Sequence, residues 1–172
     1  MEATEDEADD LAERVLDWLV AAEIVRPERT DCALGEADGG HAPGPAYPSA
    51  VKEPYDGFLT QWANGLEIDL GRTVFYGKVR EGDRFTCPRC ASWLPIEVVV
   101  DAADEWADGG AAGLRCLGCG ATAGLNEWHW DSPWAFAMLG FRFWNWPRLT
   151  EDFLAELADR LGHRTVSGCH ES

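Results

Sequence analysis

Residues 87–90 of this chain read CPRC, and residues 116–120 read CLGCG. Four of the six cysteines therefore fall into two pairs that share one internal spacing, Cys-x-x-Cys. This spacing turns both sulfurs of a pair toward one ion, and two such pairs supply the four soft ligands of a tetrahedral metal site. The predicted ligands are Cys87, Cys90, Cys116 and Cys119.

Residues that form tight turns lie inside and just after these pairs, namely Pro88, Gly118 and Gly120. On this evidence residues 84–124 resemble the zinc-ribbon group, in which two Cys-x-x-Cys knuckles at the tips of β-hairpins hold one structural zinc. The resemblance implies a closed site, with Zn²⁺ as a structural cofactor and no catalytic role. Ala91 departs from the pattern, because glycine is common at that position.

Three other interpretations of the cysteine pairs stay open. A thioredoxin-like redox pair uses a single Cys-x-x-Cys at a helix N-terminus, two disulfides require an oxidising compartment, and iron fits the same four-sulfur cage. Two pairs flanked by strand-like residues fit a thioredoxin-like pair poorly, and disulfides are not expected in a reducing cytoplasm. The ligand set alone does not exclude iron, and structural zinc is the favoured interpretation. Cys32 and Cys169 lie near the two ends of the chain, and we expect them to be buried free thiols.

The 172-residue chain is strongly acidic, with 31 acidic and 14 basic residues and a formal net charge of −17. The imbalance is greatest in residues 1–40, which hold thirteen acidic residues and three arginines. A field of this sign repels phosphate backbones, so generic nucleic acid is not an expected partner. The charge either keeps the protein in solution or attracts a basic protein partner.

Composition also predicts where the protein acts. No run of about 18 apolar residues exists, so no membrane span is expected. The first ten residues, MEATEDEADD, are acidic, whereas a secretory signal begins with basic residues and an apolar core. We therefore expect a cytoplasmic protein. Two lysines against twelve arginines, with much alanine and glycine, favour a bacterial source.

The first half of the chain predicts a helix, a loop and a hairpin. An apolar stripe of helical period predicts a helix over residues 4–25. Residues 35–50 hold four glycines and three prolines, which predicts a loop that contributes nothing to the core. Residues 66–70 alternate and are followed by Gly71, and residues 73–76 are β-branched and aromatic, which together predicts a β-hairpin.

The second half predicts a β-α-β end. Residues 96–100 are β-branched and predict a short strand, and residues 101–110 predict an acidic loop. The aromatic run 126–146 predicts strand structure. A capped helix over residues 151–161 and a last strand over 163–169 follow.

These elements predict an α+β fold with an N-terminal helix, a mixed or antiparallel sheet, an inserted four-cysteine zinc ribbon and a C-terminal β-α-β unit. Residues 1–83 form the helix-and-hairpin part, and residues 84–124 form the inserted ribbon. The aromatic-rich residues 125–172 complete one globular domain with residues 1–83.

A weaker signal lies in the aromatic run. On a strand, Trp128 and Trp130 share one face, and Glu127, His129 and Asp131 share the other. A row of carboxylate, imidazole and carboxylate could move protons or bind a metal, or it could be a solvated strand face. We favour the solvated face and assign no catalytic residue. For the aromatic run we favour a core, with Trp128 and Trp130 pointing inward; a protein-binding face and a surface that stacks bases are the alternatives.

The favoured function is that of an acidic protein with a zinc ribbon that binds another protein, as a regulatory, adaptor, inhibitor or immunity-like protein. One alternative is a zinc-ribbon protein associated with nucleic acid. Residues 80–120 argue against it, because they hold seven acidic and four basic residues. A small enzyme built on Glu127, His129 and Asp131 is the other alternative, and it is less favoured.

Overall fold

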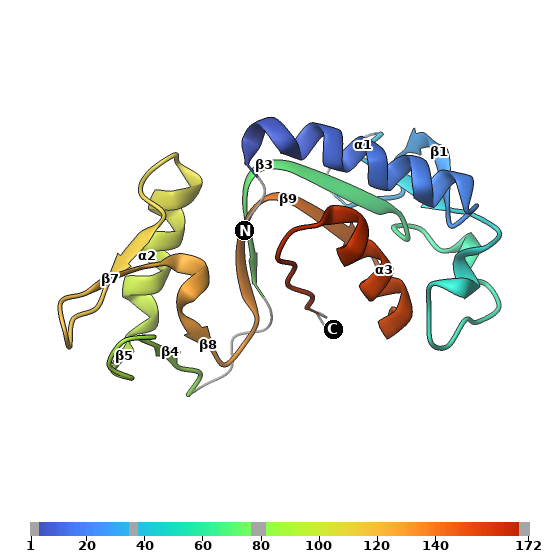
Figure 1. The fold of residues 1–172 in the computed structure, drawn as a ribbon. Helices are drawn as coiled ribbons and strands as arrows, with labels where there is room; N and C mark the ends of the chain where they lie inside the picture. The colour runs from blue at the N-terminus through green and yellow to red at the C-terminus, as the bar shows by residue number, and fades with distance from the viewer. Residues whose placement is uncertain (1–3, 35–37, 77–81, 169–172) are drawn as a thin grey trace. The chain divides into compact units, whose positions relative to one another are not determined.

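The computed structural model describes residues 4–34, 38–76 and 82–168. The chain divides into two compact units (Figure 1). Unit 1 comprises residues 1–71 with 138–165, and unit 2 comprises residues 72–137 with 166–172. Three α-helices and antiparallel strand pairs confirm the predicted α+β class. None of the helices in the described residues combines the length and apolar character that crossing a membrane requires.

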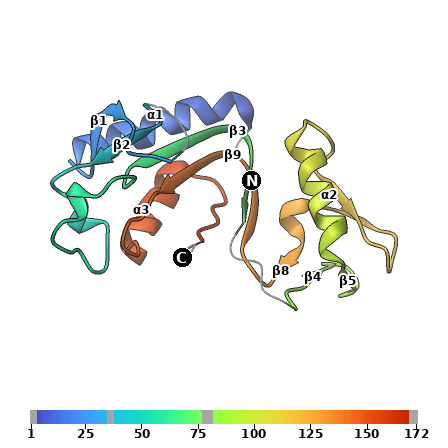
Figure 2. The same ribbon diagram turned by 180° about the vertical axis from the view of Figure 1, so that it is seen from behind.

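Unit 1 is built on a sheet with two helices packed against it. Its elements are α1 (Glu5–Ala21), β1 (Val25–Thr30), β2 (Gly40–Pro43), the 3₁₀ helices η1 (Tyr47–Ser49) and η2 (Phe58–Thr60), the first part of β3 (Leu66–Tyr76), the second part of β9 (Trp134–Phe143) and α3 (Glu151–Leu161). Residues 72–76 of β3 and 134–137 of β9 belong to unit 2. The sheet order is β1-β2-β3-β9, as Figure 2 shows. Val15 and Leu19 of α1 and Phe153 of α3 meet Val25 and Leu66 of the sheet in one core.

The first helix ends earlier than the predicted residue 25. α1 stops at Ala21, and Glu23 takes φ +56°, in the left-handed region. The N–H of Ile24 then donates to the carbonyl of Leu19 at 2.9 Å, which closes a Schellman turn. Glycine usually marks such a turn, so a glutamate in this position gave no signal in the sequence.

The glycine- and proline-rich segment, described from residue 38 to residue 50, contributes to the core, and the prediction of a coreless loop is wrong. β2 pairs antiparallel with both β1 and β3, and Tyr47 is buried. A Cβ on Gly40 would lie 2.8 Å from the Cβ of Ala33. The glycine therefore allows close approach of two backbones.

The predicted hairpin over residues 66–76 is instead one strand. β3 continues through Gly71, which takes φ +87°. A two-residue hairpin turn needs both of its central residues in turn conformation, and one glycine does not reverse the chain. The neighbours of β3 in the sheet are β2 and β9.

Unit 2 contains two hairpins and one helix. Its elements are β4 (Phe85–Thr86), β5 (Trp93–Leu94), α2 (Ile96–Ala107), β6 (Gly113–Arg115), β7 (Thr122–Gly124), the 3₁₀ helix η3 (Leu125–Glu127) and β8 (His129–Trp130). One sheet has the order β5-β4-β8, and β6 pairs with β7 in another. Both hairpins are antiparallel, so each brings its turn residues to one tip.

The strand predicted over 96–100 and the acidic loop predicted over 101–110 are wrong, because α2 spans most of both. Its buried residues are Val99, Ala103 and Trp106. They are spaced i, i+4 and i+7, so they form one helical face, and the four carboxylates of α2 are exposed. Packing of this face overrides the β preference of the valines.

The C-terminal helix confirms its predicted bounds, whereas the last strand is not formed in the described residues 163–168. The hydroxyl of Thr150 accepts a hydrogen bond from the N–H of Phe153 at 3.1 Å, and Gly162 ends the helix at φ +67°. Residues 164–168 are exposed and pair with no strand among the described residues. Up to residue 168 the C-terminal part is therefore β-α rather than β-α-β.

Candidate metal centre

The first cysteine pair lies in the turn between β4 and β5. The N–H of Cys87 donates to the carbonyl of Ser92 at 2.8 Å, and the N–H of Ala91 donates to the carbonyl of Cys87 at 3.0 Å. The N–H of Arg89 points at the sulfur of Cys87, 3.4 Å away. The backbone thus both closes the turn and supplies a donor to the sulfur.

The turn between β6 and β7 repeats this arrangement bond for bond. The N–H of Cys116 donates to the carbonyl of Ala121 at 2.8 Å, and the N–H of Gly120 donates to the carbonyl of Cys116 at 2.9 Å. The N–H of Gly118 points at the sulfur of Cys116, 3.3 Å away. Two sequence-distant turns are therefore two copies of one knuckle.

The residue that follows each pair is left-handed. Gly120 takes φ +74° and Ala91 takes φ +59°. Ala91 thus adopts the conformation for which glycine is usual, and its departure from the zinc-ribbon pattern changes the residue without changing the backbone. The knuckle geometry overrides the steric preference of alanine.

The two knuckles bring all four predicted sulfurs together. The sulfurs of Cys87, Cys90, Cys116 and Cys119 lie within 4.8 Å of one another. The distance from the sulfur of Cys90 to that of Cys116 is 3.6 Å, and from Cys87 to Cys119 it is 4.0 Å. A tetrahedron with metal–sulfur bonds of about 2.3 Å has sulfur–sulfur edges of about 3.8 Å.

These distances fit a metal ion and do not fit disulfides, whose sulfurs are about 2.05 Å apart. All the cysteines in the described part of the chain are free thiols. Cys87 and Cys116 are buried, whereas Cys90 and Cys119 are exposed. The four-sulfur cluster could therefore hold a metal ion at the edge of unit 2.

The electrostatics of the cluster also call for a cation. Hydrogen bonds from the side chain and the backbone N–H of Ser92 lower the pKa of the Cys90 thiol to about 6. At Cys119 the largest single influence is the N–H of Ala121, which lowers the pKa. The bonds with the sulfurs of Cys90, Cys116 and Cys87, together with burial, outweigh it and raise the pKa to about 11. Ionisation of one thiol therefore disfavours ionisation of its neighbour, and a bound dication would remove this repulsion between thiolates.

Ser92 is a site residue that the sequence did not reveal. Besides bonding the sulfur of Cys90, its side chain lies where a Cβ on Gly118 would be, so it packs on the opposite knuckle. Gly118 is thus required by close contact between the two knuckles. A serine two residues after a cysteine is too common to have marked this role.

Glu127, His129 and Asp131 do not interact as a catalytic row, because the two carboxylates bond backbone N–H groups elsewhere. The carboxylate of Glu127 accepts from the N–H of Gly124, and that of Asp131 accepts from the N–H of Arg84, each at 2.9 Å. His129 is exposed, and neither carboxylate bonds it among the described residues. Glu127 and Asp131 hold local backbone turns, and the three side chains do not form a joint site.

The opposite face of this segment is a core, as predicted. Trp128 is 3% exposed, and Trp130 packs on Phe85 and Trp134, with ring centroids 4.9 and 5.5 Å away. The aromatic residues thus fill unit 2 beneath the hairpin that carries the first knuckle. Cys32 is buried and free, as predicted, and Cys169 lies outside the described residues.

No protein-family model matches the chain, and neither a curated protein nor a solved structure does. The likeness to zinc ribbons therefore rests on the two knuckles alone.

Proposed function

We propose that this chain is an acidic protein-binding protein in which Cys87, Cys90, Cys116 and Cys119 hold one structural Zn²⁺. The observation that carries the metal assignment is the match between the sulfur spacings, 3.6 and 4.0 Å, and the edges of a tetrahedron. Zn²⁺ is favoured because closed four-cysteine sites are its usual structural form. Thiolate ligands persist in a reducing compartment, which supports a cytoplasmic protein.

The metal role is structural, since four protein ligands leave no position for water or substrate. Zinc joins two hairpins whose strands have only two or three residues each. Pairs this short are marginal by themselves, so the metal–sulfur bonds supply part of the folding free energy of unit 2.

Exposed apolar side chains support the protein-binding role. Trp62 is 72% exposed and Leu59 is 50% exposed, and both lie in one loop of unit 1 with the exposed ring of Tyr55. Exposed Trp and Tyr side chains are enriched where proteins bind proteins. With a net charge of −17, the favoured partner is a protein with a basic surface.

Elemental analysis tests the metal assignment. Purified protein should contain about one zinc per chain, and X-ray absorption should show four sulfur ligands. Cys116→Ser should lose the metal, whereas Cys32→Ala, which removes a thiol outside the cluster, should keep it. Iron spectra, or a fully folded metal-free protein, would show the assignment to be wrong.

A binding experiment tests the function. The intact protein and its Trp62→Ala variant serve as baits in the native extract, with Leu70→Ala as a control that removes another exposed apolar side chain. A partner should be retained by the intact protein and the control and lost by Trp62→Ala. Identical recovery with all three baits would contradict a binding role for this loop.

One observation favours nucleic acid as a second candidate partner. The two knuckle hairpins, residues 85–94 and 113–124, carry Arg89 and Arg115 and no carboxylate. Trp93 lies in the first hairpin with 60% of its surface exposed, which would suit base stacking. The acidic balance of the rest of the chain keeps this candidate second.

A further inference from the structure

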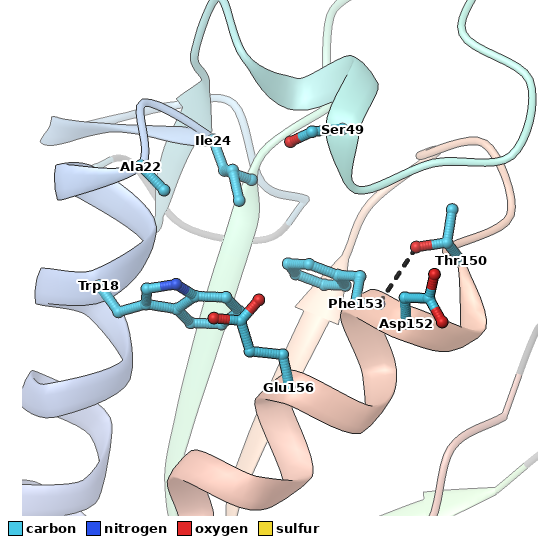
Figure 3. A pocket seen from close by; sticks show the side chains of 8 residues that line it. All are labelled: Trp18, Ala22, Ile24, Ser49, Thr150, Asp152, Phe153 and Glu156. Carbon is cyan, nitrogen blue, oxygen red and sulfur yellow. Dashed lines mark hydrogen bonds between the residues drawn. The ribbon is translucent and has the colours of Figure 1, made fainter.

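A pocket of about 450 Å³ lies in unit 1, lined by side chains of α1, η1 and α3 and of neighbouring residues (Figure 3). Its wall is aromatic, because the rings of Trp18 and Phe153 stack with centroids 5.5 Å apart and planes 22° apart. Asp152 and Glu156 add two exposed carboxylates from α3, and Ser49 adds a hydroxyl. The residues that line the pocket include no cationic side chain.

Beside this pocket one of the protein's own arginines, Arg160, already contacts an indole and a carboxylate. The guanidinium carbon of Arg160 lies 4.3 Å from the centroid of a Trp18 ring, and its nitrogen lies 2.6 Å from a carboxylate oxygen of Glu156. In Figure 3 the Glu156 side chain extends from α3 toward Trp18 on α1. An indole beside a carboxylate is a favourable environment for a planar cation.

The surface around the pocket attracts cations over a longer range. α1 and α3 together carry eleven carboxylates and two arginines, a balance of −9, of which the carboxylate of Glu151 is paired with Lys52. A concentration of one sign raises the rate at which a basic partner meets this face. The carboxylate of Asp152, unlike that of Glu156, makes no ion pair among the described residues.

We propose that this pocket receives an arginine side chain from a basic segment of a partner protein. The guanidinium lies against Trp18 and Phe153, and Asp152 accepts its hydrogen bonds. Arginine suits the pocket better than lysine, because its planar group stacks on aromatic rings and pairs with a carboxylate through two donors. The inference rests on the proposed protein-binding function and names the chemistry of the partner.

The probe for this inference is the peptide acetyl-Gly-Arg-Gly-Arg-Gly-amide, titrated into the intact metal-loaded protein and followed by NMR. Saturable shifts should appear at the Trp18 indole and along α3. The same peptide with citrulline in place of arginine keeps the shape of the side chain and removes its charge. Its affinity should be lower by a factor of about ten or more. Equal binding of the two peptides would overturn the inference in favour of an uncharged occupant.

Variants separate the pocket from the general acidity of the face. Asp152→Asn should weaken arginine-peptide binding about fivefold, since it removes a charged acceptor inside the pocket. Asp159→Asn makes the same charge change on the same helix outside the pocket, and it should change binding by less than about twofold. Equal losses in the two variants would overturn the inference, because diffuse attraction would then explain the binding.

Filling the pocket distinguishes this inference from the proposed function. Ser49→Trp changes an exposed residue and should block the arginine peptide, with folding checked by the unchanged NMR signals of unit 1 away from the pocket. If a protein partner binds this variant and Asp152→Asn as well as it binds the intact protein, the pocket inference fails and the proposed function stands. If the peptide binds but no protein partner does, the proposed function fails and the pocket remains a site for cations alone.

Discussion

Ala91 and Gly120 occupy the same place in the two knuckles and differ by one methyl group. Both are left-handed, at φ +59° and +74°. A Cβ on Gly120 would have its nearest neighbour 3.7 Å away, an ordinary contact, so only the backbone conformation distinguishes alanine from glycine there. The chain therefore contains its own matched pair for measuring left-handed strain.

We expect Ala91→Gly to stabilise the metal-loaded protein, or leave it unchanged, and Gly120→Ala to destabilise it by about 1 kcal/mol. The physical reason is the clash of a Cβ with its own carbonyl in the left-handed region, offset in part by the flexibility of glycine in the unfolded chain. Denaturant unfolding of both variants measures the two changes. Destabilisation by Ala91→Gly of more than about 1 kcal/mol would show that the methyl group packs in a way that the knuckle geometry does not account for.

Ser92 would act on a bound metal through the sulfur of Cys90. Its hydroxyl and N–H bond the sulfur of Cys90, and these bonds lower the pKa of that thiol. Ser92→Ala should reduce zinc affinity about tenfold, as loss of an outer hydrogen bond to a ligand commonly does. Competition with a chelator measures the affinity. Thr122→Val, which removes an exposed hydroxyl from the second hairpin, is the control, and an equal loss there would remove the special role of Ser92.

At the scale of elements, the segment around β8 has one face buried in the core and one face exposed to solvent. Trp128→Ala should cost about 3–5 kcal/mol, because it empties a buried site. His129→Ala should cost under about 1 kcal/mol, because the imidazole is exposed. Unfolding curves of the two variants decide between a packed core and an organised catalytic row. The row would regain support if the histidine variant were the less stable one.

Elements with a recognisable capping residue at the start and a terminating glycine at the end were predictable from the sequence. α3 has Thr150 as its N-terminal cap and Gly162 at its left-handed end, and its bounds were predicted residue for residue. α1 ends at Ala21, just before the left-handed Glu23, and its end was missed by four residues. α2 was missed because local β preference concealed a buried face that only the fold reveals.

The same distinction holds for the metal centre. The clustering of the four cysteines was predictable, since the spacing of each pair is itself a geometric requirement of a metal knuckle. Ser92 was not, because its contact with Gly118 joins segments that meet only after folding. The role of Gly40 was misjudged for a related reason. A glycine is typical both of a loop and of a close approach between backbones, and the contact with Ala33 that distinguishes the two forms only in the fold.

At the scale of the whole molecule, charge sets the choice of partner. The net charge is −17, and the basic residues of the knuckle hairpins are two arginines. We expect no micromolar binding of random single- or double-stranded oligonucleotides at physiological salt, since too few cations are gathered to release counterions. Fluorescence anisotropy measures this. Tight binding with a steep salt dependence would favour the nucleic-acid candidate over the protein-binding one.

The nine tryptophans report on the two units separately. Unit 1 holds Trp18, Trp62, Trp144 and Trp146, and unit 2 holds Trp93, Trp106, Trp128, Trp130 and Trp134. The core of unit 1 includes none of the four clustered cysteines, which all lie in unit 2. Loss of the metal should therefore change the environment of the unit 2 indoles and leave that of the unit 1 indoles unchanged.

The most direct test of the central claim, that one metal held by the four cysteines folds unit 2, is the indole region of the ¹H–¹⁵N NMR spectrum while a chelator removes the metal from the intact protein. The five indole signals of unit 2 should collapse toward unfolded positions, because part of the metal-binding free energy is folding free energy. The four indole signals of unit 1 should stay dispersed, and added zinc should restore the others. Nine signals that do not move as the metal leaves would contradict the claim.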